Sequence, residues 1–289
     1  MSSKTSVNTI MNVVGGGAIL LLVAYGAGTY YFSSAEPEGC IASYTRGATF
    51  GYRANDGRLL SAIEVQAQAG ADERGLMENT RIVEADGIAA TSALEVKLGR
   101  ADATDPSSAL GVDFAWRPVG LRAASAACLR YSVFLPDDFD FGSGGSLPGL
   151  FGGGQPPAEG ETATEGFAIR PHWSRDAHGE VIADTPMLKE ARDRLFGYRK
   201  LAFKRGRWAT IEQEVRLNAP DSKDGVLKVW FNGQLVVEED RMSLRDSAAT
   251  TIAGVMARAS FAGTGRGAPD SEHGLLRLSP LEMSWREDN

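Results

Sequence analysis

The sequence predicts an all-β fold, an antiparallel β-sandwich of the jelly-roll type, preceded by a single transmembrane α-helix. Three observations support this prediction: an uncharged apolar run near the N-terminus, a downstream series of short apolar segments that alternate at period two, and turn residues between these segments. The 289 residues are 43% hydrophobic, which suffices for a sizeable core. The net charge of -7 argues against a nucleic-acid partner, because phosphate recognition needs a concentrated basic surface.

The N-terminal segment predicts a membrane anchor. Residues 10–32 read IMNVVGGGAILLLVAYGAGTYYF, a run without charge that is long enough to cross a bilayer core of about 30 Å. Lys4 before the run and glutamates after it favour a cytoplasmic location for residues 1–9 and a large domain in the periplasm or outside the cell. We therefore expect a single-pass inner-membrane protein. A cleaved signal peptide is the alternative, with small residues at Ser33 and Ala35, but the apolar run exceeds a signal core of about 7–15 residues.

Small residues in this predicted helix suit contact with a partner helix. Ala24 and Gly28 have the small-xxx-small spacing that lets helices approach closely, and Gly26 lies between them. The expected partners are other membrane-protein subunits. The alternative is a plain tether, because glycine and alanine are ordinary in membrane spans.

The domain boundaries follow from these patterns. We expect a linker and first strand region over residues 33–60, and the jelly roll over residues 61–289. Two cysteines, Cys40 and Cys128, lie outside the anchor and could close one disulfide in an oxidising compartment. A single pair of cysteines leaves the bonded and free states equally open.

The strand pattern is clearest near residue 230. Leu227, Val229 and Phe231 alternate with Val226, Lys228 and Trp230, as in a strand with one buried and one wet face. The Asn232-Gly233 dipeptide that follows is a strong signal for a hairpin turn.

Common catalytic motifs are absent from the sequence. There is no zinc-type Cys/His spacing, no phosphate-binding GK[ST] loop, no GxSxG and no HExxH. We therefore expect no cofactor and no metal. The unusual segment is FDFGSGGSLPGLFGGGQPP, residues 139–157, whose glycines form either a linker or a backbone that approaches its neighbours closely.

This segment and its neighbours resemble a known family. YSVFLPDDFDFGSGGSLPGLFGG is similar to the signature of the polysaccharide lyase family that contains alginate and glucuronan lyases, which reads roughly YxVyFpxdFdfvkGGKLPGLyGG. The resemblance continues through GFAIRPHW, HGEVIAD and RGRWATIEQEVRLNAPDSKDGVLKVWFNGQLV, and covers about residues 93–261. It implies a jelly-roll sandwich with a glycan cleft on its concave sheet, and places the glycines in the cleft wall.

The resemblance also implies a set of site positions. Family members use a Lys in GGKLPGL, a Ser and an Arg in SxR, and two Tyr in LYAY for β-elimination on a uronate. The corresponding positions here form the expected substrate-binding cleft together with a nearby histidine: Ser146, Ala168, Arg170, His172, Ile182 and Asp184. Of the family's catalytic side chains only the arginine remains. Candidate catalytic residues are therefore Arg170, His172 as a replacement base on the same strand face, and Asp184.

These substitutions favour a lyase scaffold without lyase activity. We expect a membrane-anchored periplasmic protein that serves as a binding or structural accessory subunit of a membrane-protein assembly. The first alternative is an alginate or glucuronan lyase that acts by β-elimination with His172 as base. The second is a non-catalytic module that binds acidic polysaccharide.

Overall fold

The structure is a computed structural model that describes residues 39–70, 72–88, 90–99, 111–157, 163–190, 194–262 and 274–287. The predicted anchor over residues 10–32, with Ala24, Gly26 and Gly28, lies outside the described residues. In the described ranges no helix combines the length and apolar character that a bilayer crossing requires. A compact unit begins at Gly39, so residues 39–60 belong to the same unit as the strands that follow.

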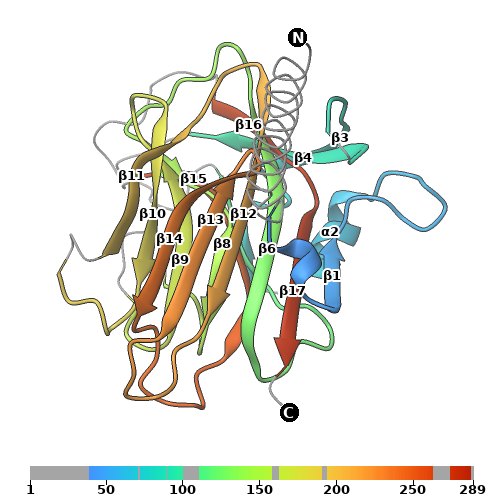
Figure 1. The fold of residues 1–289 in the computed structure, drawn as a ribbon. Coiled ribbons are helices and arrows are strands. Elements are labelled where there is room, and N and C mark those ends of the chain that lie inside the picture. The colour runs from blue at the N-terminus through green and yellow to red at the C-terminus, as the bar shows by residue number, and fades with distance from the viewer. Residues whose placement is uncertain are drawn as a thin grey trace, which may run out of the picture. The chain divides into compact units, whose positions relative to one another are not determined.

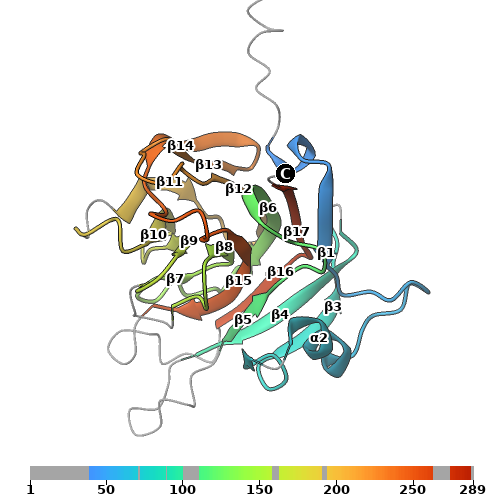
Figure 2. The ribbon, with the colours of Figure 1, turned by 90° about the horizontal axis from the view of Figure 1, so that it is seen from below.

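The strands of this unit form one continuous antiparallel network that folds into two packed layers, which we call the first and the second sheet (Figures 1 and 2). The first sheet runs in the order β14–β13–β12–β6–β17–β1, and β16, β4 and β3 extend it beside β6. Its strands are β1 (Arg46–Phe50), β3 (Thr80–Glu84), β4 (Ser92–Leu98), β6 (Ala124–Leu135), β12 (Arg207–Arg216), β13 (Gly225–Phe231), β14 (Gln234–Met242), β16 (Gly274–Leu278) and β17 (Leu281–Glu287).

The second sheet packs against the first and carries the glycine-rich segment. Its order is β11–β10–β9, then β7 and β8, which follow one another along the chain and both pair with β9 and with β15, then β15–β5–β2. Its strands are β2 (Glu73–Arg74), β5 (Val112–Trp116), β7 (Gly145–Ser146), β8 (Gly149–Gly152), β9 (Phe167–Trp173), β10 (His178–Asp184), β11 (Leu195–Ala202) and β15 (Ile252–Phe261). The all-β antiparallel fold predicted from the sequence is confirmed.

Alternating residues of both sheets fill the core between them. Leu227 and Val229 of β13 belong to the same hydrophobic cluster as Ile169 of β9 and Val255 of β15. Asn232 and Gly233 both have positive φ angles of 52° and 79°, as a two-residue hairpin turn of type I′ requires, and join β13 to β14 as predicted.

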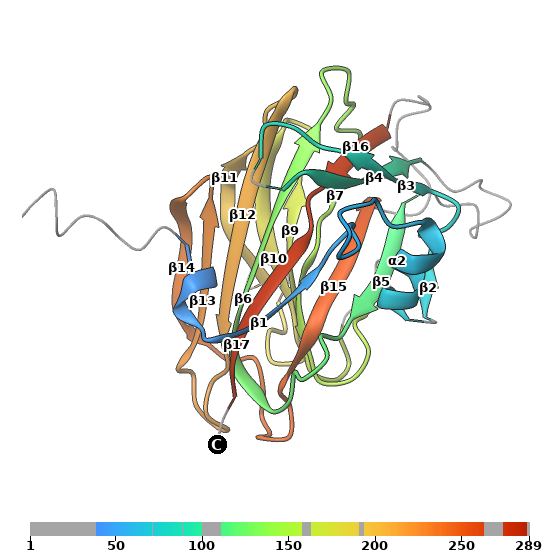
Figure 3. The same ribbon diagram turned by 90° about the vertical axis from the view of Figure 1, so that its right-hand side faces the viewer.

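Two short helices complete the described unit. The 3-10 helix η1 (Ile41–Ser43) lies against β6 and β17, and the α-helix α2 (Ala62–Ala69) lies beside β5 (Figure 3). The sequence prediction missed α2, which departs from the purely β pattern. Its signal was local: Ser61 caps the helix and exchanges hydrogen bonds with Glu64 in a capping box.

Candidate functional site

The six positions of the expected cleft, five from the resemblance and His172 from the strand pattern, share one face of the second sheet. In β9, Phe167, Ile169 and Trp173 enter the core, so the alternate residues, Ala168, Arg170 and His172, point the other way. The strand register then aligns the remaining three with them: Ser146 is opposite His172, Ile182 is opposite Arg170, and Asp184 is opposite Ala168. We call this side of the second sheet the site face.

Arg170 is held by a buried ion pair. Its Nη1 lies 2.5 Å from Oδ2 of Asp184, and both residues are about 95% buried, with 5% and 6% of their surface exposed. Arg194, which directly precedes β11, also approaches this carboxylate: its Nη1 lies 3.7 Å from Oδ1 of Asp184. The Nε of Arg170 is buried and has no hydrogen-bond partner among the described residues. The guanidinium is therefore neutralised by the protein itself.

Ser146 and His172 form a second pair beside the first. The Ser146 hydroxyl lies 2.7 Å from Nε2 of His172. Burial, reinforced by the positive charges of Arg170 and Arg258, lowers the pKa of His172 to about 3. The imidazole is thus neutral at pH 7, and its conjugate acid is far more acidic than that of an ordinary histidine.

The glycine-rich segment positions these side chains by close backbone contact. A Cβ on Gly149 would lie 2.0 Å from the carbonyl oxygen of Ile169 and 2.7 Å from the Cα of Arg170. A Cβ on Gly145 would lie 2.0 Å from the ring of Trp173. These glycines let β7 and β8 lie against β9, so the segment is part of the sheet that carries the site, not a linker between domains.

We expect Gly149→Ala to destabilise the unit by about 3 kcal/mol, because its methyl group would overlap backbone atoms that cannot move without breaking the β8–β9 pairing. Urea unfolding followed by circular dichroism measures the loss. Gly154→Ala is the matched control, since nothing lies within 4 Å of its added Cβ. Equal stabilities for the two variants would contradict the close-contact role of Gly149.

Sequence reasoning missed the residue that fastens β8 and β9 to the first sheet. The side chain of Gln213, fully buried in β12, accepts a hydrogen bond from the Leu150 N–H at 3.2 Å and donates one to the Ile169 carbonyl at 3.0 Å. The sequence did offer a signal for Gln213, because it lies on the same side of the predicted strand as the apolar residues Ile211 and Val215. A buried amide with both hydrogen-bonding ends satisfied fixes the backbone on either side of the site.

A further charged group at the same face was also missed. Arg258 of β15 is almost fully buried and donates to Oδ2 of Asp113 at 2.8 Å, while Arg74 donates to the same oxygen at 2.8 Å. These three residues line a pocket of about 150 Å³ with Asp72, Phe114, Ala115, Gln155 and Pro156. Arg258 also contributes to the low pKa of His172, which ties this group to the site.

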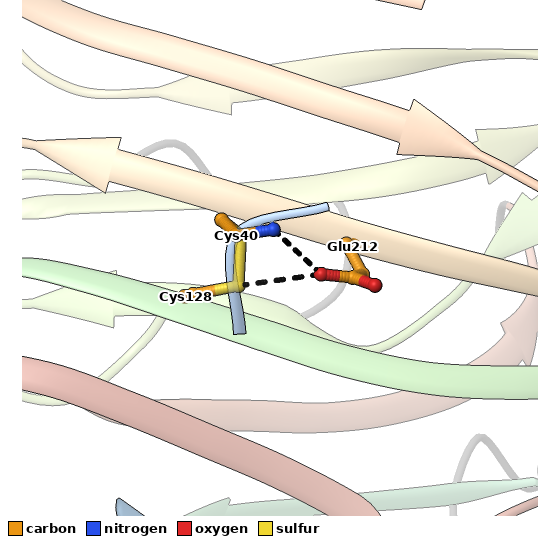
Figure 4. Close-up of side chains that lie close together, drawn as sticks. All are labelled: Cys40, Cys128 and Glu212. Carbon is orange, nitrogen blue, oxygen red and sulfur yellow. Dashed lines mark hydrogen bonds between the residues drawn. A yellow bond between two sulfur atoms is a disulfide. The ribbon is translucent and has the colours of Figure 1, made fainter. Parts of the chain in front are cut away.

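The two cysteines lie on the opposite sheet from the site face. Cys40 and Cys128 form a disulfide with a Cα–Cα distance of 5.7 Å, which fastens the segment around η1 to β6 (Figure 4). Glu212 of β12 lies next to this bond, and its Oε2 accepts the Cys40 N–H at 2.7 Å.

The site face offers limited acid–base chemistry. Its arginine and aspartate neutralise one another, its histidine is a weak base, and its serine is fully buried. Abstraction of a carbon-bound proton needs a base whose pKa is near the working pH, together with a group that stabilises the negative charge. The described site face therefore lacks a group suited to removing a carbon-bound proton near pH 7.

Comparison with known proteins gives the family. The model of the family described as "Polysaccharide lyase 14" matches residues 88–269. No curated protein matches the sequence significantly. Among solved structures, the alginate lyase from Aplysia kurodai has a TM-score of 0.63 at 21% identity, over 75% of this chain and 90% of that one.

Two further structures agree with this result. The alginate lyase from Chlorella virus has a TM-score of 0.58 at 20% identity, over 73% of this chain and 90% of that one. Alginate lyase Aly36B has a TM-score of 0.56 at 13% identity, over 84% and 98%. At these identities the similar structures establish the fold alone. The family model matches more than half of the sequence, and this chain therefore belongs to polysaccharide lyase family 14.

Proposed function

We propose that this member of the family does not catalyse β-elimination and acts instead as a binding or structural accessory subunit, anchored in the inner membrane with its folded unit in the periplasm. The observation that carries the proposal is the internal pairing of the site face. Arg170 is bound to Asp184, and Ser146 is bound to His172. A uronate carboxylate would have to compete with Asp184 for the buried arginine.

The resemblance supports the loss of the catalytic groups. Ser146 stands where family members have a lysine, Ala168 where they have a serine, and Ile182 and Asp184 where they have tyrosines. Loss of one acid–base participant typically costs about 10²–10⁴-fold in rate, and here several are replaced together. His172 does not restore the base, because a conjugate acid with a pKa of about 3 leaves little driving force for proton abstraction.

An elimination assay tests the loss of activity. The full-length protein in mild detergent is incubated with alginate or with polyglucuronate, and unsaturated uronate ends are followed by their ultraviolet absorbance. We expect no increase above the buffer signal, while the Aplysia alginate lyase, run in parallel on alginate, gives one. A steady increase that persists on further purification of our protein would instead support the alternative, an active lyase.

Copurification tests the accessory role. We expect the full-length protein to copurify with membrane-protein partners from detergent-solubilised membranes, and Gly28→Leu to lose them while still inserting, because bulk at a close helix contact prevents approach. Thr29→Leu is the matched control, since residue 29 lies about 140° around the helix from Ala24 and about 100° from Gly28. If both variants retain everything that the parent binds, the helix is a plain tether.

A further inference from the structure

The chain that follows β8 crosses to the site-face side of β15. We call residues Gly153–Pro157 the strap. In β15, Ala257 and Ala259 enter the core, so Arg258 between them points to the site face. Its Nη2 donates to the carbonyl oxygen of Pro157 at 2.8 Å, which places the end of the strap on that face.

A second arginine holds the middle of the strap. Arg117, which directly follows β5, donates from Nη2 to the carbonyl oxygen of Gly154 at 3.2 Å and to Oε1 of Gln155 at 3.1 Å. Its guanidinium also lies over the ring of Phe151, 5.0 Å from the centroid. Both acceptors on the strap are uncharged, and within the described ranges Arg117 forms no ion pair. Uncharged oxygens are weaker acceptors for a guanidinium than carboxylates, so this contact can break at modest cost.

The strap lies next to an apolar cluster on the site face. Phe151, Ala168 and Met256 form this cluster, which is separate from the main core, and each is 0% exposed. Met256 pairs with Ala115 of β5, and Ala115 lines the pocket of about 150 Å³ together with two residues of the strap. The strap is therefore one wall of a space that adjoins the cluster.

The strap itself buries little apolar surface. Its first three residues are exposed and its two prolines are half-buried. The pocket beneath it is lined in part by four charged side chains, Asp72, Arg74, Asp113 and Arg258. Segments with few buried apolar contacts open at low free energy while the rest of the fold stays intact. We therefore expect the strap to open locally.

The first residue of the strap is fixed, and the second is not. The N–H of Gly153 donates to the carbonyl oxygen of Thr251 at 3.0 Å, and a Cβ on Gly153 would lie 2.8 Å from the Cα of Gly166. Gly154 has nothing within 4 Å of an added Cβ, and glycine has the widest range of backbone angles. A rotation at Gly154 can therefore move the rest of the strap while its base stays in place.

We propose that the strap is a lid over this part of the site face. In the closed state, which the structure shows, Arg117 and Arg258 hold the strap across β15, and the apolar cluster is covered. In the open state the strap turns about Gly154, and the cluster becomes accessible from solvent. The strap thereby controls which ligands reach the cluster, and this control does not depend on whether the protein is an enzyme.

Thiol labelling measures the opening, because the two native cysteines are bonded to each other and an introduced cysteine is the only free thiol. Met256→Cys in the full-length protein in mild detergent is checked for its fold by circular dichroism and labelled with iodoacetamide, and the mass is followed. We expect slow labelling, and Arg117→Met in the same background to speed it by about tenfold or more, since it removes hydrogen bonds to a charged group. Equal rates with and without Arg117→Met would overturn the proposal.

Two controls separate opening of the strap from a loss of overall stability. Val255→Cys changes the adjacent residue of β15, which is also 0% exposed but faces the core, so its labelling requires unfolding. Arg117→Met should leave this labelling unchanged. Arg122→Met removes a positive charge from the same turn, and Arg122 makes no hydrogen bond to the strap within the described structure, so Met256→Cys should stay slow. If either control gains as much as the test pair, the strap is not the barrier and the proposal fails.

A second probe and a second variant make the result independent of any one substitution. Ala115→Cys is a smaller change than Met256→Cys and lies in the pocket beneath the strap. Gln155→Ala removes only one of the two hydrogen bonds from Arg117 to the strap, and should speed labelling at either probe less than Arg117→Met does. Labelling of Ala115→Cys that neither variant changes would contradict the closure.

Discussion

Asp184→Ala is expected to destabilise the folded unit by about 3–5 kcal/mol, because it leaves the buried guanidinium of Arg170 without its counter-ion. Urea unfolding of the parent and the variant measures this difference. Asp176→Ala is the matched control, since that carboxylate pairs with Arg199 at the exposed surface and its loss should change the stability little.

A double variant separates the loss of charge pairing from the loss of packing. Arg170→Met in the Asp184→Ala background removes the orphaned charge and is expected to restore most of the lost stability, since buried ion pairs are often replaced by apolar side chains at little cost. If Asp184→Ala unfolds at the same denaturant concentration as the parent, the ion pair is not what holds the site face closed.

Loss of the disulfide is the second large effect. Replacing both Cys40 and Cys128 by serine should lower the free energy of unfolding by about 4 kcal/mol, because the bond closes a loop between residues 88 positions apart and thereby restricts the unfolded chain. Unfolding of the parent and the variant is measured in urea under non-reducing conditions.

Adding reductant provides the internal control for this comparison. It should reduce the stability of the parent to that of the double serine variant and leave the variant unchanged. Equal stabilities before reduction would mean that the segment around η1 is held by its hydrogen bonds to Glu212 and Ser284 alone.

Local patterns predicted much of the fold. The alternation in β13 and the Asn232-Gly233 turn depend on neighbours in sequence, and both are present in the structure. The helix α2 was missed because its eight residues are too few for a clear apolar period, although its capping box was visible.

Residue patterns alone predicted the site only within each strand, whereas the site positions on β7 and β10 came from the family resemblance. Period two places Arg170 and His172 on one side of β9, and this needs no structure. The contribution of Arg258 depends on β15 lying near β9 in the sheet, and that of Gln213 depends on the contact between the two sheets. Such long-range pairings are set by the packing of the whole core, so a local pattern, such as a glutamine on the core side of β12, can mark a residue but does not identify its partners. The neighbourhood of Glu212 was missed for the same reason.

Deuterium exchange at C5 of a uronate tests the central claim most directly, because it detects proton abstraction even where no leaving group departs. Saturated oligouronates are incubated with the full-length protein in D₂O, and the C5 proton signal is followed by NMR. We expect the signal to persist as in the protein-free sample, since His172, with a pKa lowered to about 3, is too weak a base. Loss of the C5 signal with the parent, but not with His172→Ala, would contradict the account and establish His172 as a working base.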